Sequence, residues 1–251
     1  MKDNGLVVII PARYGSSRLP GKPLVDICGA PMVVRVAQRA SLIKGASRVV
    51  VATDDKKIAK EVEQAGFSYV MTAKSHPSGT DRIAEAVRHL ELSPDQVVVN
   101  VQGDQPLLDV TAIDRMVELL ITKNDFVMTT VACPLDVAAA SDPNRVKVVL
   151  DEGGRALYFS RSVIPFDRDK RVVGHESPYL RHLGLYCYRV DFLQKFVNWP
   201  EGRLEAIERL EQLRVLEKGL SIGVAIVENA SPEVDTEDDL KRVRKLFKGP
   251  F

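Results

Sequence analysis

The sequence predicts an α/β protein with a Rossmann-like, mostly parallel central sheet flanked by helices. Three observations indicate this class. Short apolar runs rich in β-branched residues recur along the first half, as is typical of strands buried on both faces. Segments with helix signals separate these runs, a pattern that favours βαβ units. Each run ends in a polar loop, and the loops that follow parallel strands meet at one edge of the sheet.

The elements of the first half follow from local signals. A helix is expected to begin at Pro31, since proline is tolerated in a first helical turn. Gly66 is a good stop for the second helix. The predicted strands are 6–11, 48–53, 67–72 and 96–101, and the predicted helices are 31–44, 56–66 and 78–92.

The second half changes character. Gly and Pro turns separate shorter strands, which predicts an antiparallel excursion. The segment 236–246 begins with a threonine and an acidic first turn, which favours a helix. No linker is evident, so we expect one domain over residues 1–251, with about 126–200 as an inserted dimerisation or lid element. The predicted strands are 126–133, 146–150, 156–159, 183–188 and 220–227, and the predicted helices are 203–218 and 236–246.

Composition limits the possible partners. The chain has 251 residues and a net charge of +1, which argues against a broad nucleic-acid surface. No apolar run approaches the roughly 20 residues that cross a bilayer, so no membrane contact is expected. The three cysteines, Cys28, Cys133 and Cys187, form no CxxC pair, which predicts free thiols in a reducing cytoplasm.

The loop after the first strand carries Arg13, Arg18 and Lys22 on a short backbone. It is not a Walker A motif, because five residues rather than four separate Gly15 from Gly21, and because Pro23 stands where a magnesium-binding hydroxyl is required. Three close cations repel one another, and a triphosphate would relieve this through guanidinium and ammonium contacts. The alternative is a solvated basic loop.

Two aspartates are candidates for a metal pair. Asp104 follows a buried strand through Gly103, so its carboxylate can reach the cleft at the sheet edge. Magnesium prefers one or two carboxylates together with phosphate oxygens and water. Asp235, between a strand and a helix start, is the leading second ligand. Taken singly, Asp104 could be a turn former and Asp235 a helix N-terminal charge.

Many ordered blocks along the chain resemble one family, the 3-deoxy-manno-octulosonate (Kdo) cytidylyltransferases, also called CMP-Kdo synthetases. The resemblance implies the glycosyltransferase-A-like nucleotidyltransferase fold, a homodimer, and a sugar-binding role for the insertion. The blocks are RYGSSRLPGKPL (13–24), VATD (51–54), SGTDR (78–82), NVQGD (100–104), VKVV (146–149), ALYFSR (156–161), RHLG (181–184), LEQLR (210–214) and VDTEDDL (234–240).

The activity implied by the resemblance is a cytidylyl transfer. CTP and Kdo would give CMP-Kdo and diphosphate, with Mg²⁺ as cofactor, for lipopolysaccharide biosynthesis. One alternative is the same reaction on 8-amino-Kdo or another acidic sugar, and Gln105 leaves this open because many relatives have an acidic residue there. A second alternative is a CTP-binding module without turnover, although the Asp104 and Asp235 pair argues against it.

The resemblance also assigns roles to single residues. The catalytic set is Asp104, Asp235, Lys22 and Arg13, and the metal ligands are Asp104 and Asp235. The nucleotide set is Ala12, Arg13, Ser16, Arg18, Lys22, Ser78, Gly79, Thr80 and Arg82. The sugar set is Gln102, Arg161, His182, Tyr186, Glu211 and Gln212.

Several of these residues have structural alternatives. Ser78 and its neighbours have the pattern of a helix cap. A lone histidine such as His182 is more often structural than functional. Leu204, Ile207 and Leu210 recur at helical spacing as a buried stripe, and Glu211 falls on it, which predicts a paired or cavity-facing carboxylate. The other histidines, His76, His89 and His175, carry no motif.

Overall fold

The computed structural model describes residues 5–15, 19–169 and 177–248. The chain divides into two compact units. Unit 1 comprises Met1–Thr111, Arg189–Val197 and Ser231–Phe251, and unit 2 comprises Ala112–Tyr188 and Asn198–Ala230. The prediction of a single domain with an insertion at about 126–200 stays a prediction. Within the described residues, no helix is both long and apolar enough to cross a membrane.

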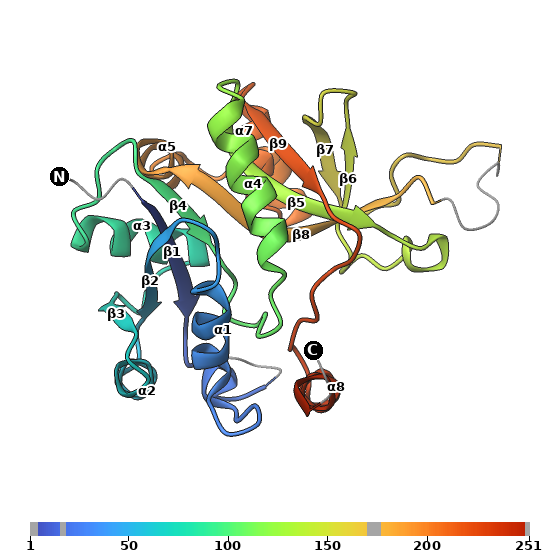
Figure 1. Ribbon diagram of the computed structural model, residues 1–251. Coiled ribbons are helices and arrows are strands. Elements are labelled where there is room, and N and C mark those ends of the chain that lie inside the picture. The colour runs from blue at the N-terminus through green and yellow to red at the C-terminus, as the bar shows by residue number, and fades with distance from the viewer. Residues whose placement is uncertain (1–4, 16–18, 170–176, 249–251) are drawn as a thin grey trace. The chain divides into compact units, whose positions relative to one another are not determined.

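Unit 1 is built on a parallel sheet (Figure 1). Strands β3, β2, β1 and β4 lie side by side in that order, with β1 paired to β2 and β4. Val8, Ile9 and Ile10 of β1 have no exposed surface, as expected of a strand covered on both faces. The strands are β1 (Leu6–Ala12), β2 (Ala46–Thr53), β3 (Ser68–Met71) and β4 (Val97–Asn100).

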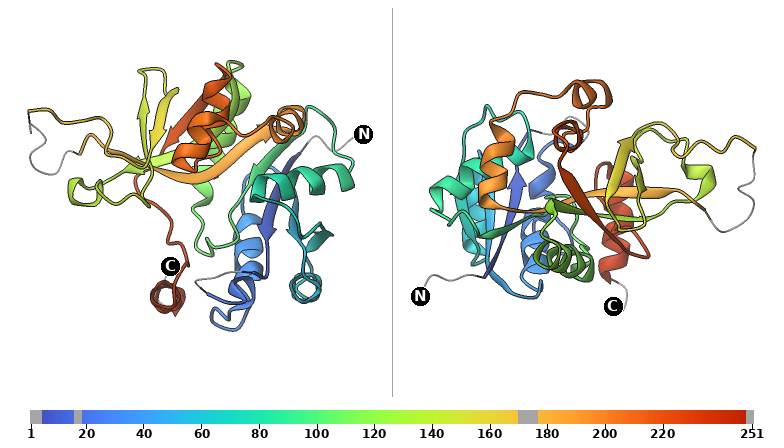
Figure 2. Two further views of the ribbon diagram at one scale, coloured as in Figure 1. Left: turned by 180° about the vertical axis from the view of Figure 1, so that it is seen from behind. Right: turned by 90° about the horizontal axis from the view of Figure 1, so that it is seen from above.

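Helices cover this sheet. Helix α3 contacts β1, β2 and α5, and Figure 2 shows α3 and α5 next to each other. Helix α8 packs through Leu240 and Val243 against Leu19, Ile27 and Met32. The elements are the short 3-10 helix η1 (Lys22–Leu24), α1 (Met32–Ala40), α2 (Lys56–Gln64), α3 (Gly79–His89), α5 (Val190–Val197) and α8 (Glu237–Lys248).

Unit 2 holds a mixed sheet. Strand β5 is antiparallel to β8 and parallel to β9, and β6 is antiparallel to both β7 and β8. The antiparallel excursion is therefore confirmed. The elements are α4 (Val110–Thr122, nearly all in this unit), β5 (Phe126–Pro134), η2 (Val137–Ala139), β6 (Lys147–Leu150), β7 (Ala156–Ser160), β8 (Leu180–Arg189), α6 (Arg203–Glu208), α7 (Leu213–Glu217) and β9 (Ser221–Ile226).

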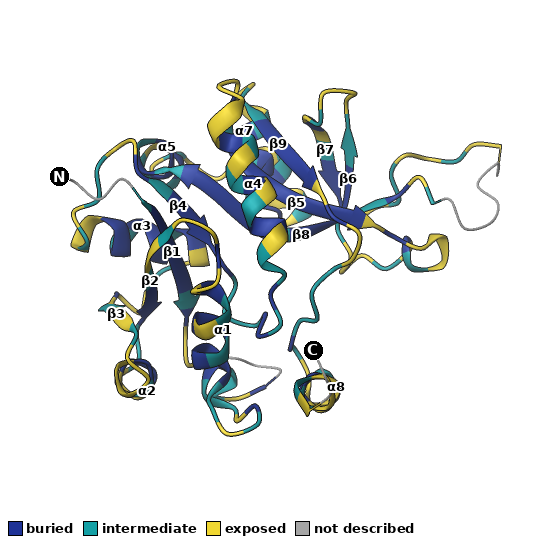
Figure 3. Cartoon of the chain, viewed as in Figure 1, coloured by how far each residue is buried: buried dark blue, intermediate teal, exposed yellow. Residues whose placement is uncertain are grey.

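The predicted α/β class is confirmed, and buried residues concentrate along the strands of each unit (Figure 3). Two helices, α4 and α5, were not predicted. Both follow loops with weak start signals. The carboxylate of Asp109 accepts a hydrogen bond from the amide of Thr111 and so supports the beginning of α4.

The prediction of one helix over 203–218 is wrong. Arg209 has a left-handed backbone (φ 54°, ψ 48°), which ends α6, and α7 begins only at Leu213. The buried stripe fails with it, because the side chain of Ile207 lies on the surface at 70% exposure. The apolar residues of 203–218 recur with helical spacing, but tertiary contacts at the end of α6, described below, favour two separate helices.

Candidate active site

Unit 1 contains a cavity of about 350 Å³ at the carboxyl ends of its strands. The end of β1, the Lys22 region, the loop before α3, the loop after β4 and Asp235 line it. Parallel strands with helical crossovers bring their following loops to one edge, where α/β proteins bind ligands. The expected clustering of the first loop with the loop after β4 is therefore confirmed.

Lys22 lies between the two predicted metal carboxylates. Its Nζ donates to Oδ2 of Asp104 at 2.8 Å and to Oδ1 of Asp235 at 2.9 Å. Burial alone disfavours the ammonium, but the charges and hydrogen bonds of the two aspartates outweigh burial and raise the pKa of Lys22 above its ordinary value. Asp104 and Asp235, which follow Lys22 in the sequence by 82 and 213 positions, thus share its ammonium group.

Backbone contacts hold the two aspartates near each other. The amide of Val234 donates to the carbonyl of Asp104 at 2.9 Å, and the Val234 side chain is fully buried. A Cβ at Gly103 would stand 3.0 Å from the carbonyl oxygen of Pro11, so only glycine lets the loop after β4 pass this close to β1.

The donor set at this edge fits a magnesium ion. Two carboxylates that face one cavity supply hard oxygen ligands, and Lys22 already places a positive charge between them. Mg²⁺ in proteins is typically held by one or two carboxylates, with water and substrate phosphates completing the octahedron. Asp104 and Asp235 are thus the residues that would hold it.

Gln105 does not line the cavity. Its buried side chain donates through Nε2 to Oε1 of Glu233 at 3.3 Å. An acidic residue at position 105 would place a second carboxyl group against Glu233, so the glutamine matches its local surroundings.

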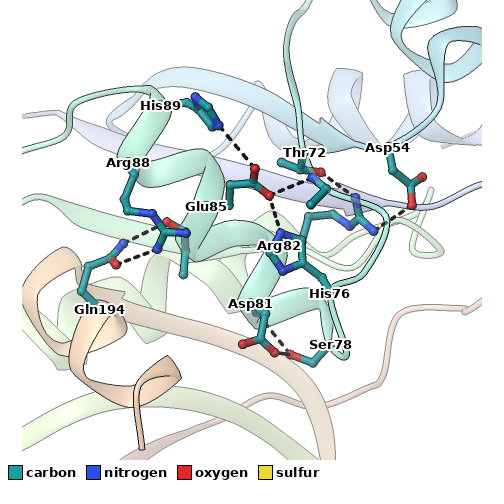
Figure 4. Close-up of polar contacts among 12 residues, drawn as sticks. Asp54, Thr72, His76, Ser78, Asp81, Arg82, Glu85, Arg88, His89 and Gln194 are labelled. Atoms are coloured by element: carbon teal, nitrogen blue, oxygen red, sulfur yellow. Dashed lines mark hydrogen bonds and ion pairs between the residues drawn. The ribbon is translucent and has the colours of Figure 1, made fainter.

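Arg82, predicted to bind the nucleotide, lines the cavity, and two neighbouring side chains hold its guanidinium (Figure 4). Its guanidinium donates to Oγ1 of Thr72 at 2.6 Å and to Oδ2 of Asp54 at 3.0 Å, and its side chain is only 4% exposed. A buried guanidinium requires such partners, because an unpaired buried charge is strongly destabilising. Asp54, at the end of β2, therefore fixes the position of this cation.

The segment that begins α3 serves as a helix cap and lines the cavity at once. Ser78 is the N-cap, and its hydroxyl accepts from the amide of Asp81 at 3.2 Å and donates to the Asp81 carboxylate at 2.7 Å (Figure 4). Ser78 and Gly79 line the cavity, and Thr80 is buried. A Cβ at Gly79 would lie 3.3 Å from the Pro11 ring, so this glycine permits close packing on β1.

His76 also lines the cavity, although the sequence offered no motif for it. Its Nε2 contacts Oε2 of Glu85, and the same oxygen accepts from the amide of Ala73 at 2.9 Å (Figure 4). Burial alone would raise the pKa of Glu85, but hydrogen bonds from His76, Ala73 and His89 outweigh burial and lower it to about 2. The sequence signal that could have indicated a role for His76 was its position two residues before Ser78, which was predicted to bind the nucleotide.

The remaining predicted nucleotide residues come from the first loop. Ala12 and Arg13 line the cavity, with Ala12 buried and Arg13 exposed. Ser16 and Arg18 lie outside the described residues. Gln102, assigned to the sugar, also lines the cavity, and its Nε2 donates to Oδ1 of Asn100 at 3.3 Å.

The other predicted sugar residues belong to unit 2, where three of them form one hydrogen-bonded group. The hydroxyl of Tyr186 donates to Oε1 of Gln212 at 3.1 Å, and Nε2 of Gln212 lies 3.4 Å from Nδ1 of His182. Burial and the charge of Arg181 lower the pKa of His182 to about 3. Burial and the charge of Glu211 raise the pKa of Tyr186 well above its ordinary value.

Arg161 contacts the end of α6. Its guanidinium donates to the carbonyls of Glu208 at 2.7 Å and Arg209 at 3.3 Å. The Glu208 carboxylate in turn accepts from the Ser160 hydroxyl at 2.6 Å and the Arg161 amide at 2.9 Å. These contacts satisfy helix-end carbonyls that have no intrahelical partner, which explains why α6 stops there. The assigned sugar role of Arg161 stays a prediction.

The break after α6 also decides where Glu211 and Gln212 lie. Gln212 is 2% exposed and is the N-cap residue of α7, whereas Glu211 is half-buried. The predicted stripe does not account for the burial of these two residues, and the predicted cavity-facing or paired state of the Glu211 carboxylate stays a prediction.

A basic loop and two carboxylates at the carboxyl edge of a parallel sheet are typical of nucleotide-binding α/β proteins. A family model for cytidylyltransferases matches residues 7–222. The chain therefore belongs to the cytidylyltransferase family and is a nucleotidyltransferase.

Solved structures agree with this family. The structure of CMP:2-keto-3-deoxy-manno-octonic acid synthetase complexed with CTP is 40% identical over 97% of this chain and 98% of that one, with a TM-score of 0.90. Two others share the fold alone. A cytidylyltransferase from Leptospira borgpetersenii serovar Hardjo-bovis (strain JB197) is 15% identical over 96% of this chain and 85% of that one, with a TM-score of 0.62. A 4-diphosphocytidyl-2C-methyl-D-erythritol synthase is 12% identical over 97% and 98%, with a TM-score of 0.64.

Proposed function

We propose that this protein transfers a cytidylyl group from CTP to 3-deoxy-manno-octulosonate, giving CMP-Kdo and diphosphate for lipopolysaccharide biosynthesis. The observation that carries the proposal is the cavity of unit 1, in which Lys22, Asp104 and Asp235 come together. The likeness to a synthetase of the same sugar, at 40% identity over nearly the whole chain, supports the choice of substrate.

In the proposed reaction the anomeric hydroxyl of the sugar gives up its proton to water, its oxygen attacks the α-phosphorus of CTP, and diphosphate leaves with the electron pair of the broken P–O bond. Catalysis of phosphoryl-type transfers is mainly positioning and charge neutralisation. Lys22 and Arg13 would neutralise the phosphate oxygens at the end of β1. Arg82, anchored by Asp54, would hold a fixed positive charge beside them.

Asp104 and Asp235 are proposed to hold Mg²⁺. When bound, this ion would supply Lewis-acid polarisation of the phosphate oxygens. Lys22 keeps the two carboxylates paired with a cation through its 2.8 Å and 2.9 Å contacts. Val234 and Gly103 keep their two loops at the short separation that a shared ligand requires.

The sugar side of the proposal rests on Gln102, Arg161, His182, Tyr186, Glu211 and Gln212. We further propose a homodimer in the cytoplasm. In the described part of the chain Cys28, Cys133 and Cys187 form no disulfide bond, as is usual for proteins of a reducing compartment. Size-exclusion chromatography with light scattering tests the dimer.

Diphosphate release from CTP, Mg²⁺ and a sugar acid tests the function. Kdo should give stoichiometric diphosphate and a CMP-sugar, with 8-amino-Kdo and a sialic acid tested in parallel. If 8-amino-Kdo turned over faster than Kdo, the proposed sugar substrate would be 8-amino-Kdo instead. CTP binding without diphosphate release on any sugar would overturn the enzymatic assignment to this reaction.

A further inference from the structure

Unit 2 contains a buried chain of hydrogen bonds that includes Thr130, a residue with no assigned role. Thr130 on β5 has no exposed surface, and its Oγ1 lies 2.9 Å from Nε2 of His182 and 2.5 Å from the carbonyl oxygen of Leu185. His182 in turn contacts Gln212, and Gln212 contacts Tyr186. The chain therefore runs from Leu185 through Thr130 to three residues that the proposed function assigns to the sugar.

The proton positions along this chain follow from one fixed end. A backbone carbonyl only accepts, so the single hydroxyl hydrogen of Thr130 is given to Leu185. Thr130 must then accept from His182, which places the ring hydrogen on Nε2. Nδ1 of the neutral ring is left as an acceptor, and Gln212 must face it with its amide hydrogens.

The far end of the chain is fixed by the same logic. With its Nε2 turned to His182, Gln212 presents Oε1 to Tyr186, whose hydroxyl donates at 3.1 Å. The raised pKa of Tyr186 keeps that hydroxyl protonated, and the lowered pKa of His182 keeps the ring neutral. The ring of His182 is also packed edge-on against Phe159, with centroids 4.9 Å apart, so it has little freedom to turn.

We propose that Thr130 is a positioning residue, which fixes the Nε2–H tautomer of His182 and thereby the orientation of the Gln212 amide and the Tyr186 hydroxyl for sugar binding. The proposal rests on the proposed function for its sugar-binding part alone. The tautomer itself is a property of the folded chain and is testable without any substrate.

The strand supplies a matched control. Thr129 is equally buried, and its hydroxyl donates to the carbonyl of Met116 at 2.8 Å. Thr129→Val and Thr130→Val therefore each delete one buried hydroxyl that donates to a backbone carbonyl. Only the hydroxyl of Thr130 also accepts from a histidine.

The experiment is ¹⁵N imidazole NMR of the full chain labelled at histidine, with the His182 signals assigned through His182→Gln. The wild type and Thr129→Val should show the Nε2–H tautomer at His182. Thr130→Val should show a shift toward the Nδ1–H tautomer, and Thr130→Ser should restore the wild-type pattern. An Nδ1–H tautomer in the wild type, or an unchanged tautomer in Thr130→Val, would overturn the proposal.

Kinetics supply the second measurement. Thr130→Val should raise the KM for the sugar about tenfold, the effect of misplacing one hydrogen bond, while the KM for CTP stays unchanged. Thr130→Ser should recover the low KM, and Thr129→Val should keep it. Equal losses in the two valine variants would show a merely structural role. If no sugar turns over, the proposed function fails, and the NMR result still decides the role of Thr130.

Discussion

Nζ of Lys22 lies 2.8 Å from Oδ2 of Asp104, although the two residues are 82 positions apart in the sequence. One comes from the loop after β1 and the other from the loop after β4, and β1 and β4 are neighbours in the parallel sheet. The pairing is a direct consequence of strand order. It brings together the cation proposed to bind phosphate and a carboxylate proposed to bind the metal, and a metal-bound nucleotide phosphate would need both.

Removal of the ammonium should weaken nucleotide binding. Lys22→Ala is expected to raise the dissociation constant for CTP by about tenfold or more, since a charge-assisted contact to phosphate is lost. Isothermal titration calorimetry measures this. Lys60→Ala, on the exposed side of α2, is the control and should bind CTP as the wild type does. Unchanged CTP affinity and turnover in Lys22→Ala would remove the phosphate role.

Neutralising Asp104 should separate binding from turnover. Asp104→Asn keeps the shape of the side chain and removes its charge, so CTP is expected to bind within about threefold of wild type while turnover falls about 100-fold or more. Mn²⁺ binding in the presence of CTP, followed by electron paramagnetic resonance, should weaken in parallel. The exposed Asp95→Asn is the control. Near-normal turnover would rule out Asp104 as the metal ligand.

The buried pair of Arg82 and Asp54 should contribute to stability as well as to the cavity. Arg82→Met leaves the Asp54 carboxylate without its cation and is expected to lower the free energy of unfolding by about 3 kcal/mol. The double variant Arg82→Met/Asp54→Asn removes that stranded charge and should recover part of the loss. Urea denaturation measures both. A double variant less stable than the sum of its two single changes would contradict this account.

Glu85 should stabilise the fold in a pH-dependent way. Its pKa in the folded chain is about 2 against an ordinary 4.5, so its contribution is complete above pH 4.5 and is lost as the pH falls toward 2. Glu85→Gln is expected to cost about 1 to 2 kcal/mol at pH 7, after allowance for solvent screening.

Urea denaturation at a series of pH values tests the role of Glu85. The difference between wild type and Glu85→Gln should shrink as the pH falls from about 4.5 to 3. Glu63→Gln, on the exposed face of α2, should show no such trend. A difference that stays constant over this range would mean that the Glu85 carboxylate is not what holds His76 and Ala73.

Prediction from sequence was most reliable where local signals and burial agree. The apolar runs of β1, β2 and β4 are buried whatever their neighbours, and the loops after parallel strands must share an edge. The helix over 203–218 shows the limit. Its apolar residues recur with helical spacing. However, Arg161 donates a hydrogen bond to the backbone carbonyl of Glu208, and Ser160 donates one to the Glu208 carboxylate. These long-range contacts override the local preference for a helix.

The α/β class, the loop after β1 and the likeness to cytidylyltransferases can be predicted from the amino-acid sequence, because they depend on residue type and short spacing. The contacts of Lys22 with Asp104 and Asp235, the position of His76 at the cavity, and the hydrogen bond between Thr130 and His182 follow from tertiary structure instead. Each of these depends on which side chains meet across strands far apart in sequence. Strand order and packing set such meetings, and local pattern does not encode them.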